Sequence, residues 1–176
     1  MPKSLFIDKP KLSPSLALIA TDKVALKENS ISTTTRRRVK DRPIPPTELI
    51  TALQTQLQGF ETEIGLSTEL VSNITHCTLS ATYLSALLLI TSEALNNIRL
   101  HAHATSVLMF VYLHDHTLRL EIIDNGIGMK PNKIYQSDSD GISRMHAAAI
   151  QLGGSLSIAA SPGKGTLLTL TTITEK

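Results

Sequence analysis

Three polar side chains at intervals of four residues stand out in the middle of the chain: Glu93, Asn97 and His101. In an α-helix, residues four apart lie on the same face, so this spacing predicts one polar face that carries all three groups. Mg²⁺ prefers oxygen ligands and commonly bridges protein groups to phosphate oxygens, which suits the Asn97 amide as a ligand and Glu93 as its neighbour. A carboxylate could also act as a general base or orient a group beside a γ-phosphate. The three residues therefore predict a site for a metal ion and a nucleotide.

A second candidate group is the segment Asp124-Asn125-Gly126-Ile127-Gly128-Met129. Asp124 follows a predicted strand, and its carboxylate could accept a hydrogen bond from the exocyclic amine of a purine. Gly126 and Gly128 allow the backbone to approach a ring closely because they carry no Cβ. Taken alone, Asp-Asn-Gly more often marks a plain turn, and the polar residues of the first group could be the exposed face of an ordinary helix. Their occurrence together predicts a nucleotide pocket.

The helix that carries the first group is predicted over about residues 82 to 102, as a wall between the core and the ligand. Its other face follows the helical period and is mostly apolar. The residues of this predicted core stripe are Leu84, Leu88, Thr91, Leu95, Ile98 and Ala102. An earlier helix is predicted to be capped by Thr47 and to end at Gly65. Its apolar residues at helical spacing are Leu49, Ile50, Leu53, Leu57, Phe60 and Ile64.

Short runs of apolar residues predict the strands of a sheet. The predicted strands cover residues 67–71, 107–112, 117–123, 156–159 and 166–173. The second and third form a hairpin around His114-Asp115-His116, and the second is apolar on both faces, which predicts an interior position. A helix over residues 142–152 stops at Gly153-Gly154. Because the helices are grouped between strands instead of alternating strictly with them, we predict an α+β two-layer sandwich, a mixed sheet covered by helices on one face.

Four sequence boxes in this order resemble the ATP-binding domain that sensor histidine kinases share with type II topoisomerases, the Hsp90 chaperones and the MutL repair proteins, the GHKL group. The chain is most similar to kinases of the nitrate/nitrite-sensor type. The boxes are Glu-Ala-Leu-x-Asn-x-x-x-His-Ala at 93–102, Asp-Asn-Gly-x-Gly-Met at 124–129, Gly141 to Met145 with Leu152-Gly153-Gly154, and Gly163-Lys164-Gly165-Thr166. The resemblance covers roughly residues 47 to 176 and implies the same Bergerat-type fold.

The resemblance also implies ATP and Mg²⁺ as ligands. Glu93 would be the catalytic residue, and Asn97 would hold the metal. The residues implied to bind the nucleotide and its metal are Asn97, His101, Asp124, Gly126, Gly128, Met129, Gly141, Gly165 and Thr166.

The chain departs from the family pattern in and after the predicted ATP lid, which covers about residues 130 to 140. Relatives commonly carry a glycine two residues before Gly141, where this chain has Ser139. They carry a basic and acidic run where this chain reads His146-Ala147-Ala148. The cations of the predicted lid are Lys130 and Lys133. Phosphate binding is therefore predicted less firmly than adenine binding.

A histidine kinase of this type places its phosphoacceptor histidine on a dimerisation helix before the ATP-binding domain, yet no histidine precedes His76 in this sequence. We therefore predict the catalytic domain of a two-component sensor histidine kinase that lacks its own phosphoacceptor helix. It would transfer the phosphoryl group in trans, with a phosphoacceptor histidine protein or response regulator as partner and a homodimer as one option. Two alternatives stay open: a non-catalytic, anti-sigma-like regulatory module, and ATP hydrolysis as in topoisomerase-like relatives, although the transducer domain they need is missing.

Composition fits one domain with an appendage, since 176 residues with 41% hydrophobic content can form a single core. Residues 1–46 combine scattered prolines, a Ser/Thr stretch and a basic cluster, which predicts a flexible or partly ordered tail before an ATP-binding domain at 47–176. The basic cluster lacks interleaved aromatic residues and the net charge is only +2, so nucleic-acid binding is not favoured.

The sequence gives three further expectations. A single cysteine, Cys77, excludes an internal disulfide framework and agrees with a reducing cytoplasm. No apolar run approaches the roughly 20 residues that span a membrane, so a cytoplasmic protein is predicted. The pairs His101-x-His103 and His114-x-His116 have ligand-like spacing, but no acidic or thiolate cluster accompanies them, and a transition-metal site is not favoured.

Overall fold

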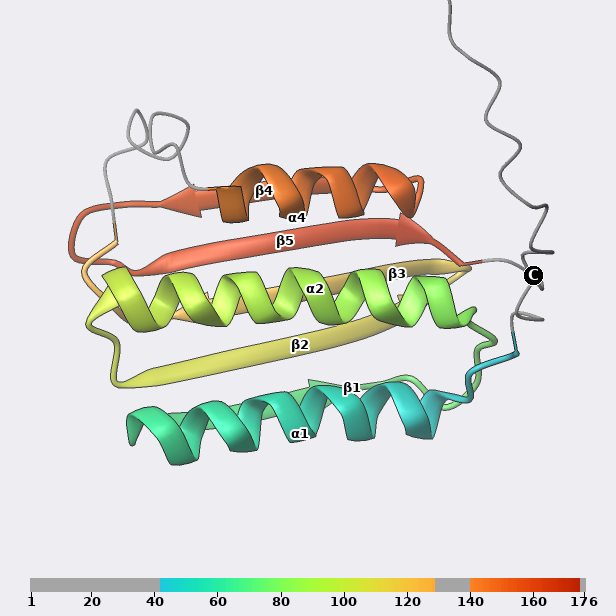
Figure 1. Cartoon of the computed structure of the whole chain (residues 1–176), viewed down its shortest axis with the longest axis horizontal. Helices are drawn as coiled ribbons and strands as arrows, with labels where there is room; N and C mark the ends of the chain where they lie inside the picture. The colour runs from blue at the N-terminus through green and yellow to red at the C-terminus, as the bar shows by residue number, and fades with distance from the viewer. Residues whose placement is uncertain (1–41, 129–139, 175–176) are drawn as a thin grey trace, which may run out of the picture. The chain divides into compact units, whose positions relative to one another are not determined.

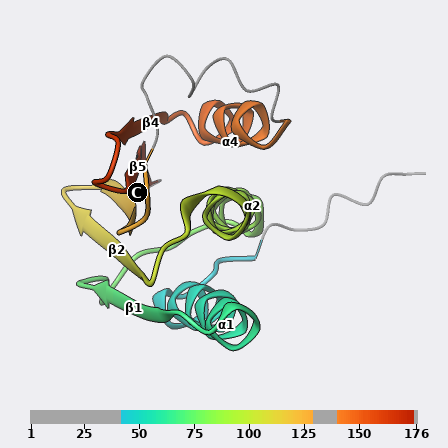
Figure 2. The ribbon, with the colours of Figure 1, turned by 90° about the vertical axis from the view of Figure 1, so that its left-hand side faces the viewer.

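In the computed structural model, which describes residues 42–128 and 140–174, one sheet carries helices on one of its faces (Figures 1 and 2). The elements are α1 (Pro46–Ile64), β1 (Ser67–Ser72), α2 (Ala81–Asn97), the π-helical turn η1 (Ile98–Ala102), β2 (Ser106–His114), β3 (Thr117–Asp124), α4 (Asp140–Gln151), β4 (Ser155–Ala160) and β5 (Thr166–Ile173). The sheet order is β1-β2-β3-β5-β4, with β1 parallel to β2 and all other neighbours antiparallel. This arrangement confirms the predicted α+β two-layer sandwich.

The strands follow the predicted alternation of side chains. Each predicted strand is present with ends within two residues of the prediction, and the ends of β5 coincide with it. In β3, Leu118, Leu120 and Ile122 are at most 2% exposed and face the helix layer. β2 lies between β1 and β3, which confirms its interior position. The β2–β3 turn has left-handed φ values of 45° at Asp115 and 65° at His116.

Helix α1 begins differently from the prediction. Its N-cap residue is Pro45, without a side-chain cap, and Thr47 lies inside the helix, so the predicted Thr47 cap is wrong. Proline suits the first helical position because its φ is already helical and it has no N–H to satisfy. The end is as predicted: Gly65 has a φ of 76° and donates its N–H to the Glu61 carbonyl at 2.8 Å. Ile44, in the segment predicted as tail, is buried and bridges to Leu79.

Helix α2 lies in the middle of the helix layer, between α1 and α4 (Figure 1). The predicted core stripe is correct in the second half of this helix, whereas in the first half Leu84 and Leu88 pack against the core but are only half-buried. Leu87 and Ile90 are instead buried, at 1% and 0% exposure. An apolar run fits more than one helical face, and contact with neighbours on three sides decides which face is enclosed.

The polypeptide leaves α2 through the π-helical turn η1, which the sequence did not predict. A π-helix is wider than an α-helix, so the four-residue spacing no longer keeps side chains on one face. The turn brings the Ala102 carbonyl to the loop after β3, where it accepts a hydrogen bond from the Ile127 N–H at 2.8 Å. Residue 103 then adopts a left-handed φ of 51° and ends the helix.

Several predictions fall outside the described residues. These are the structure of residues 1–41, the predicted lid up to residue 139, and the role of Met129. Within residues 42–128 and 140–174, no helix combines the length and apolarity needed to cross a bilayer.

Candidate functional site

The predicted site residues come from one end of the sheet and its helices. The C-terminal end of α2, the end of β3 and the start of α4 all lie at the left in Figure 1. The described residues form two groups there, which we call the helix wall (Glu93, Asn97, Gly141 and Arg144) and the loop wall (Asp124, Gly126, Gly128 and Gly165). The turn η1 connects them, because it follows Asn97 and ends against Gly126.

The helix wall brings together three residues that the sequence predicted as site residues. The Glu93 residue is buried, with 9% exposure, and Asn97 is half-buried. A Cβ added to Gly141 would lie 2.8 Å from Glu93 Oε2 and 3.9 Å from Asn97 Oδ1. The first turn of α4 therefore lies against both side chains, and a Cβ at 141 would displace the Glu93 carboxylate but only touch the Asn97 amide. Glu93 and Asn97 thus share Gly141 as a neighbour, and their role in one site stays a prediction.

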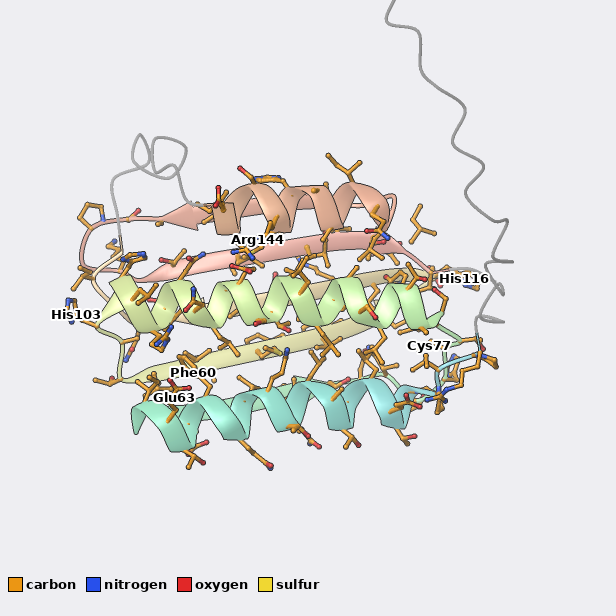
Figure 3. The ribbon with its side chains drawn as sticks, viewed as in Figure 1. Phe60, Glu63, Cys77, His103, His116 and Arg144 are labelled. Atoms are coloured by element: carbon orange, nitrogen blue, oxygen red, sulfur yellow. The ribbon has the colours of Figure 1, made fainter. Side chains whose placement is uncertain are left out.

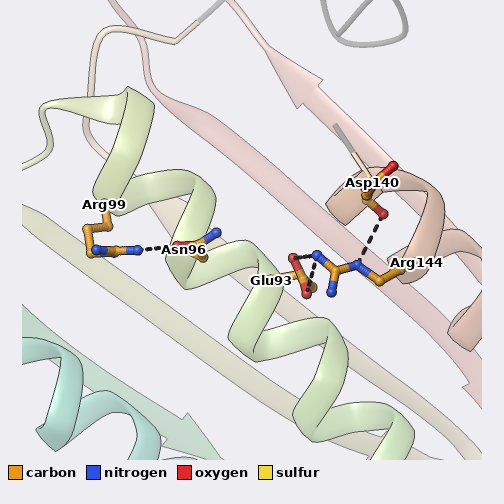
Figure 4. A network of polar contacts seen from close by, with 5 residues as sticks. All are labelled: Glu93, Asn96, Arg99, Asp140 and Arg144. Atoms are coloured by element: carbon orange, nitrogen blue, oxygen red, sulfur yellow. Dashed lines mark hydrogen bonds and ion pairs between the residues drawn. The ribbon is translucent and has the colours of Figure 1, made fainter. Parts of the chain in front are cut away.

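A fourth member of the helix wall, Arg144, was not predicted as a site residue. Its side chain extends from α4 toward α2 (Figure 3). Its Nη2 lies 3.1 Å from Glu93 Oε1 and 3.3 Å from Oε2, and its Nε donates to the Asp140 carbonyl at 3.3 Å (Figure 4). Helical spacing carried a weak signal, since Arg144 follows Gly141 by three residues and so shares its side of α4.

The loop wall is built around Asp124, the last residue of β3. Asp124 is 3% exposed, and its Oδ1 accepts a hydrogen bond from the Gly126 N–H at 2.8 Å. Thr166, another predicted site residue, is its register partner on β5. A buried carboxylate held in one orientation can present its remaining lone pairs as acceptors for an amine.

Three glycines of the loop wall allow backbone segments to touch. A Cβ on Gly165 would lie 1.9 Å from the Asp124 carbonyl oxygen, one on Gly128 2.1 Å from the Ser161 oxygen, and one on Gly126 2.2 Å from the Ala102 oxygen. Gly128 and Gly165 also have left-handed φ values of 60° and 71°. From the sequence, Gly126 and Gly128 were expected to allow close approach of a nucleotide ring. In the structure, their neighbours are other parts of the backbone.

Asn125 is a structural residue of this loop that the prediction left without a role. Its Oδ1 accepts hydrogen bonds from the Thr105 and Ser106 backbone N–H groups at 2.9 and 3.0 Å, and its Nδ2 donates to Thr105 Oγ1 at 2.8 Å. The side chain therefore ties the loop after β3 to the start of β2. Its position next to Asp124 is a signal that sequence reasoning could have used, since Asn side chains commonly bond to nearby backbone groups.

His101 differs from the other predicted helix residues. It lies in the π-helical turn η1 and is exposed, whereas Glu93 lies in α2 and is buried. Its contact with a nucleotide stays a prediction. Among the described residues, no three His, Cys, Asp or Glu side chains come together as a metal-binding group.

The two walls fit a nucleotide that carries a divalent metal ion. Glu93 and Asn97 present carboxylate and amide oxygens near one point at the start of α4, and these are ligand types that Mg²⁺ prefers. Arg144 adds a cation at the same place. The buried Asp124 provides an acceptor in the other wall. The described part of the chain thus contains donors for a metal, a charge for phosphate and an acceptor for a base.

Comparison with known proteins relates the chain to a family of ATPases. The family model described as histidine kinase-, DNA gyrase B-, and HSP90-like ATPase matches residues 83–176. Sensor histidine kinase LiaS of Bacillus subtilis is 36% identical over 77 residues, which cover 44% of this chain and 21% of LiaS. Signal transduction histidine-protein kinase/phosphatase UhpB of Salmonella typhimurium is 31% identical over 127 residues, which cover 72% of this chain and 25% of UhpB. The chain therefore spans about a quarter or less of these curated relatives.

Solved structures share the fold. The histidine kinase domain of the blue-light activated histidine kinase from Erythrobacter litoralis EL346 superposes with a TM-score of 0.62 at 18% identity, over 74% of this chain and 62% of that one. The Acinetobacter baumannii histidine kinase AdeS gives a TM-score of 0.62 at 14% identity, over 79% of this chain and 70% of AdeS.

The family match covers more than half of the chain and includes residues of both walls. The relatives and the solved structures are histidine kinases. The chain therefore belongs to the histidine kinase-, DNA gyrase B- and HSP90-like ATPase family, as the histidine kinase-type ATPase domain that its sequence boxes predicted.

Proposed function

We propose that this domain binds ATP with Mg²⁺ and transfers the γ-phosphoryl group to a histidine in trans. The observation that carries the proposal is the convergence of a buried Glu93 carboxylate and the Asn97 amide at the start of α4. Burial of a carboxylate is costly unless the site uses or compensates its charge. A nucleotide site with a metal ion and a phosphate gives that charge a function.

Asp124 is proposed to recognise the adenine ring. Its carboxylate would accept a hydrogen bond from the exocyclic amine, while the bond from the Gly126 N–H fixes its orientation. Gly126, Gly128 and Gly165 keep the backbone around it closely packed, so the Asp124 carboxylate is attached to a fixed backbone. This wall would therefore provide selection for the base.

The helix wall is proposed to act at the phosphates. Asn97 Oδ1 would be a ligand of Mg²⁺, which when bound neutralises charge on the phosphate oxygens. Glu93 would accept a hydrogen bond from the attacking group and so orient its lone pair toward the γ-phosphorus. Gly141 leaves room for the Glu93 carboxylate, because a Cβ at that position would lie only 2.8 Å from Glu93 Oε2.

The phosphoacceptor is proposed to lie outside this sequence. The first histidine of the chain is His76, which lies in the loop between β1 and α2, within the domain itself. The printed names of LiaS and UhpB describe a sensor histidine kinase and a histidine-protein kinase/phosphatase. A two-component partner, with a response regulator downstream, is therefore the proposed context. Assignment to the nitrate/nitrite-sensor type, a cytoplasmic location and a homodimer stay predictions from the sequence.

Base recognition is tested by Asp124→Asn. The amide presents a donor where the adenine amine also donates, and we expect ATP affinity to fall by about tenfold or more because a buried polar group loses its partner. Titration calorimetry with Mg-ATP measures this. Glu121→Gln is the matched control, because Glu121 lies on the same strand but pairs with Arg119 at the other face of the sheet. Unchanged affinity in Asp124→Asn would remove its proposed role.

Metal binding is tested by a pair of neighbouring asparagines. Asn97→Ala is expected to reduce the gain in ATP affinity that Mg²⁺ provides by about tenfold, because one oxygen ligand is lost. Asn96→Ala is the control, because Asn96 points away and accepts a hydrogen bond from Arg99 at 2.6 Å (Figure 4). Equal effects of the two substitutions, or equal loss with and without Mg²⁺, would exclude Asn97 as a ligand.

One observation favours a second function, a nucleotide-dependent regulatory module without phosphoryl transfer. Glu93, the proposed catalytic group, is engaged by Arg144. Incubation of the chain with γ-labelled ATP and a histidine-containing acceptor domain separates the two functions. Label on the acceptor supports the kinase, whereas ATP binding without transfer to any tested acceptor supports the regulatory module.

A further inference from the structure

The Glu93–Arg144 pair is asymmetric in its exposure. The Glu93 side chain is 11% exposed, whereas the Arg144 side chain is 57% exposed. The carboxylate therefore stays in the wall between α2 and α4, and the guanidinium reaches it from the solvent side. The solvated guanidinium can turn away from this pair, but the buried carboxylate that it leaves then needs another cation nearby, which the proposed Mg²⁺ would supply.

The position of the guanidinium matters more than the strength of the pair. Arg144 contacts Glu93, which shares Gly141 as a neighbour with the proposed metal ligand Asn97. If the nucleotide phosphates approach that metal ligand, they come within reach of the same arginine. Guanidinium groups bind phosphate oxygens through directed, charge-assisted hydrogen bonds, as they do carboxylates. Glu93 and a phosphate would thus compete for one cation.

We infer that Arg144 is a phosphate-binding residue of the nucleotide site, and that Glu93 holds it until a nucleoside di- or triphosphate arrives. This inference rests on the proposed function. The Nε–H of Arg144 donates to the Asp140 carbonyl, which anchors the side chain near its own helix while the terminal nitrogens exchange partners. The exchange releases the Glu93 carboxylate only when phosphate is present, so an engaged catalytic group becomes free together with its substrate.

A purely structural role makes different predictions. If Arg144 only clamps α4 to α2, its loss weakens the fold of the site and lowers the affinity for every adenine ligand alike. If it binds phosphate, the loss depends on the number of phosphates. Adenosine, ADP and ATP therefore separate the two roles.

The first experiment measures the affinity of the full chain for these three ligands with Mg²⁺, by calorimetry for ADP and ATP and by NMR titration for adenosine. Arg144→Gln is expected to lower ATP affinity about tenfold and to leave adenosine affinity within about twofold. Arg144→Lys is expected to lie between wild type and Arg144→Gln, because it keeps the charge without the fork. Arg99→Gln is the matched control and should match wild type, since Arg99 also pairs with a glutamate, Glu63, but on the α1 side of α2.

The outcomes are distinct. An equal loss for adenosine and ATP in Arg144→Gln, or no loss for ATP, overturns the phosphate role of Arg144. Failure of wild type to bind any of the three ligands refutes the proposed function itself. Binding by wild type with unaltered ATP affinity in Arg144→Gln refutes the inference alone.

A second experiment measures the coupling between Glu93 and Arg144 from stability, without measuring phosphoryl transfer. The urea midpoints of wild type, Glu93→Gln, Arg144→Gln and the double variant form a double-mutant cycle. We expect the two substitutions to be non-additive without nucleotide and additive in saturating Mg-ATP, because the phosphates have then separated the pair. The same coupling with and without ATP would show that the pair does not open, and would overturn the inference.

Discussion

The helix wall and the loop wall, which carry the candidate site residues, are built with different kinds of close contact. In the helix wall, the nearest atom to a Cβ at Gly141 is Glu93 Oε2, the end of a rotatable side chain, at 2.8 Å. In the loop wall, the nearest atoms to Gly126, Gly128 and Gly165 are backbone carbonyl oxygens, at 1.9 to 2.2 Å. The loop wall is therefore fixed by the backbone, whereas the helix wall can adjust by side-chain rotation. A rigid base-recognition region beside an adjustable phosphate region suits the proposed function.

The opposite face of α2 shows that polar composition alone does not produce such a wall. There, Asn96 and Arg99 help to line a pocket of about 390 Å³ between α1 and α2, with Phe60 and Glu63 of α1 opposite (Figure 3). Arg99 lies 3.8 Å from Glu63, and their side chains are 42% and 64% exposed. A Cβ on Gly59 would meet nothing within 4 Å. The two faces share residue types but differ in burial and close approach.

The largest expected effect is on the loop wall, with Gly165→Ala. Its Cβ would collide with the Asp124 carbonyl, and its φ is left-handed, so the free energy of unfolding should fall by about 3 kcal/mol. Urea denaturation measures the change. Gly163→Ala is the control: its φ is 72° but no atom lies within 4 Å, and it should cost about 1 kcal/mol. Equal losses would show that the close backbone contact does not constrain the loop wall.

A smaller change in stability is expected on the helix wall, with Gly141→Ala. The free energy of unfolding should change by less than about 1 kcal/mol, because the Glu93 carboxylate can rotate away and alanine favours a helix. The metal-dependent part of ATP affinity should nevertheless fall about tenfold, because the displaced carboxylate crowds Asn97. Denaturation and calorimetry with and without Mg²⁺ test both halves. A large loss of stability would mean that this wall is as rigid as the other.

A stabilising effect is expected on the α1 side of α2, with Gly59→Ala. Alanine in a helix interior is favoured over glycine by about 0.5–1 kcal/mol, and the open space around Gly59 adds no clash. Thermal unfolding should show a higher midpoint, and Mg-ATP affinity should be unchanged. A loss of ATP affinity here would break the distinction between the two faces of α2.

The smallest effect is expected for Arg99→Gln. Both partners of its ion pair are largely exposed, so the free energy of unfolding should change by less than about 0.5 kcal/mol. Chemical denaturation in low salt measures this against Arg144→Gln, which breaks a pair with a buried carboxylate and should cost more. The reverse order of losses would contradict the assignment of the stronger contact to the helix wall.

Much of the fold could be predicted because the signals act over a few residues. The turn at Gly163 and Gly165 precedes a strand whose alternation gives both ends of β5, and Gly65 ends α1 because it accepts a left-handed φ. The predicted start of α1 was wrong because threonine is a common N-cap residue, whereas the proline before Thr47 already has a helical φ and lies inside the helix. In α2, the apolar run fits more than one helical face and so does not determine which residues are fully buried. Leu87 is buried, whereas the prediction was Leu88.

The candidate site divides in the same way. Glu93, Asn97 and Asp124 could be proposed from the sequence because their types and spacing are informative along one helix and one loop. Arg144 could not, because its contact with Glu93 joins residues 51 apart in sequence. Similarly, the π-helical turn before His103 packs against the loop after β3 through the hydrogen bond from the Ile127 N–H to the Ala102 carbonyl. No local sequence pattern predicts this turn.

The sequence by itself determined the order of strands and helices, the turns that glycine permits, and the residue types available for metal, base and phosphate. These follow from periodicity and backbone sterics, which each residue and its near neighbours settle. The tertiary structure alone decided which leucines in the first half of α2 are fully buried, how closely α4 approaches Glu93, and that an arginine holds the proposed catalytic carboxylate. Those features depend on distances between segments far apart in the chain, and such distances exist only once the two layers have packed together.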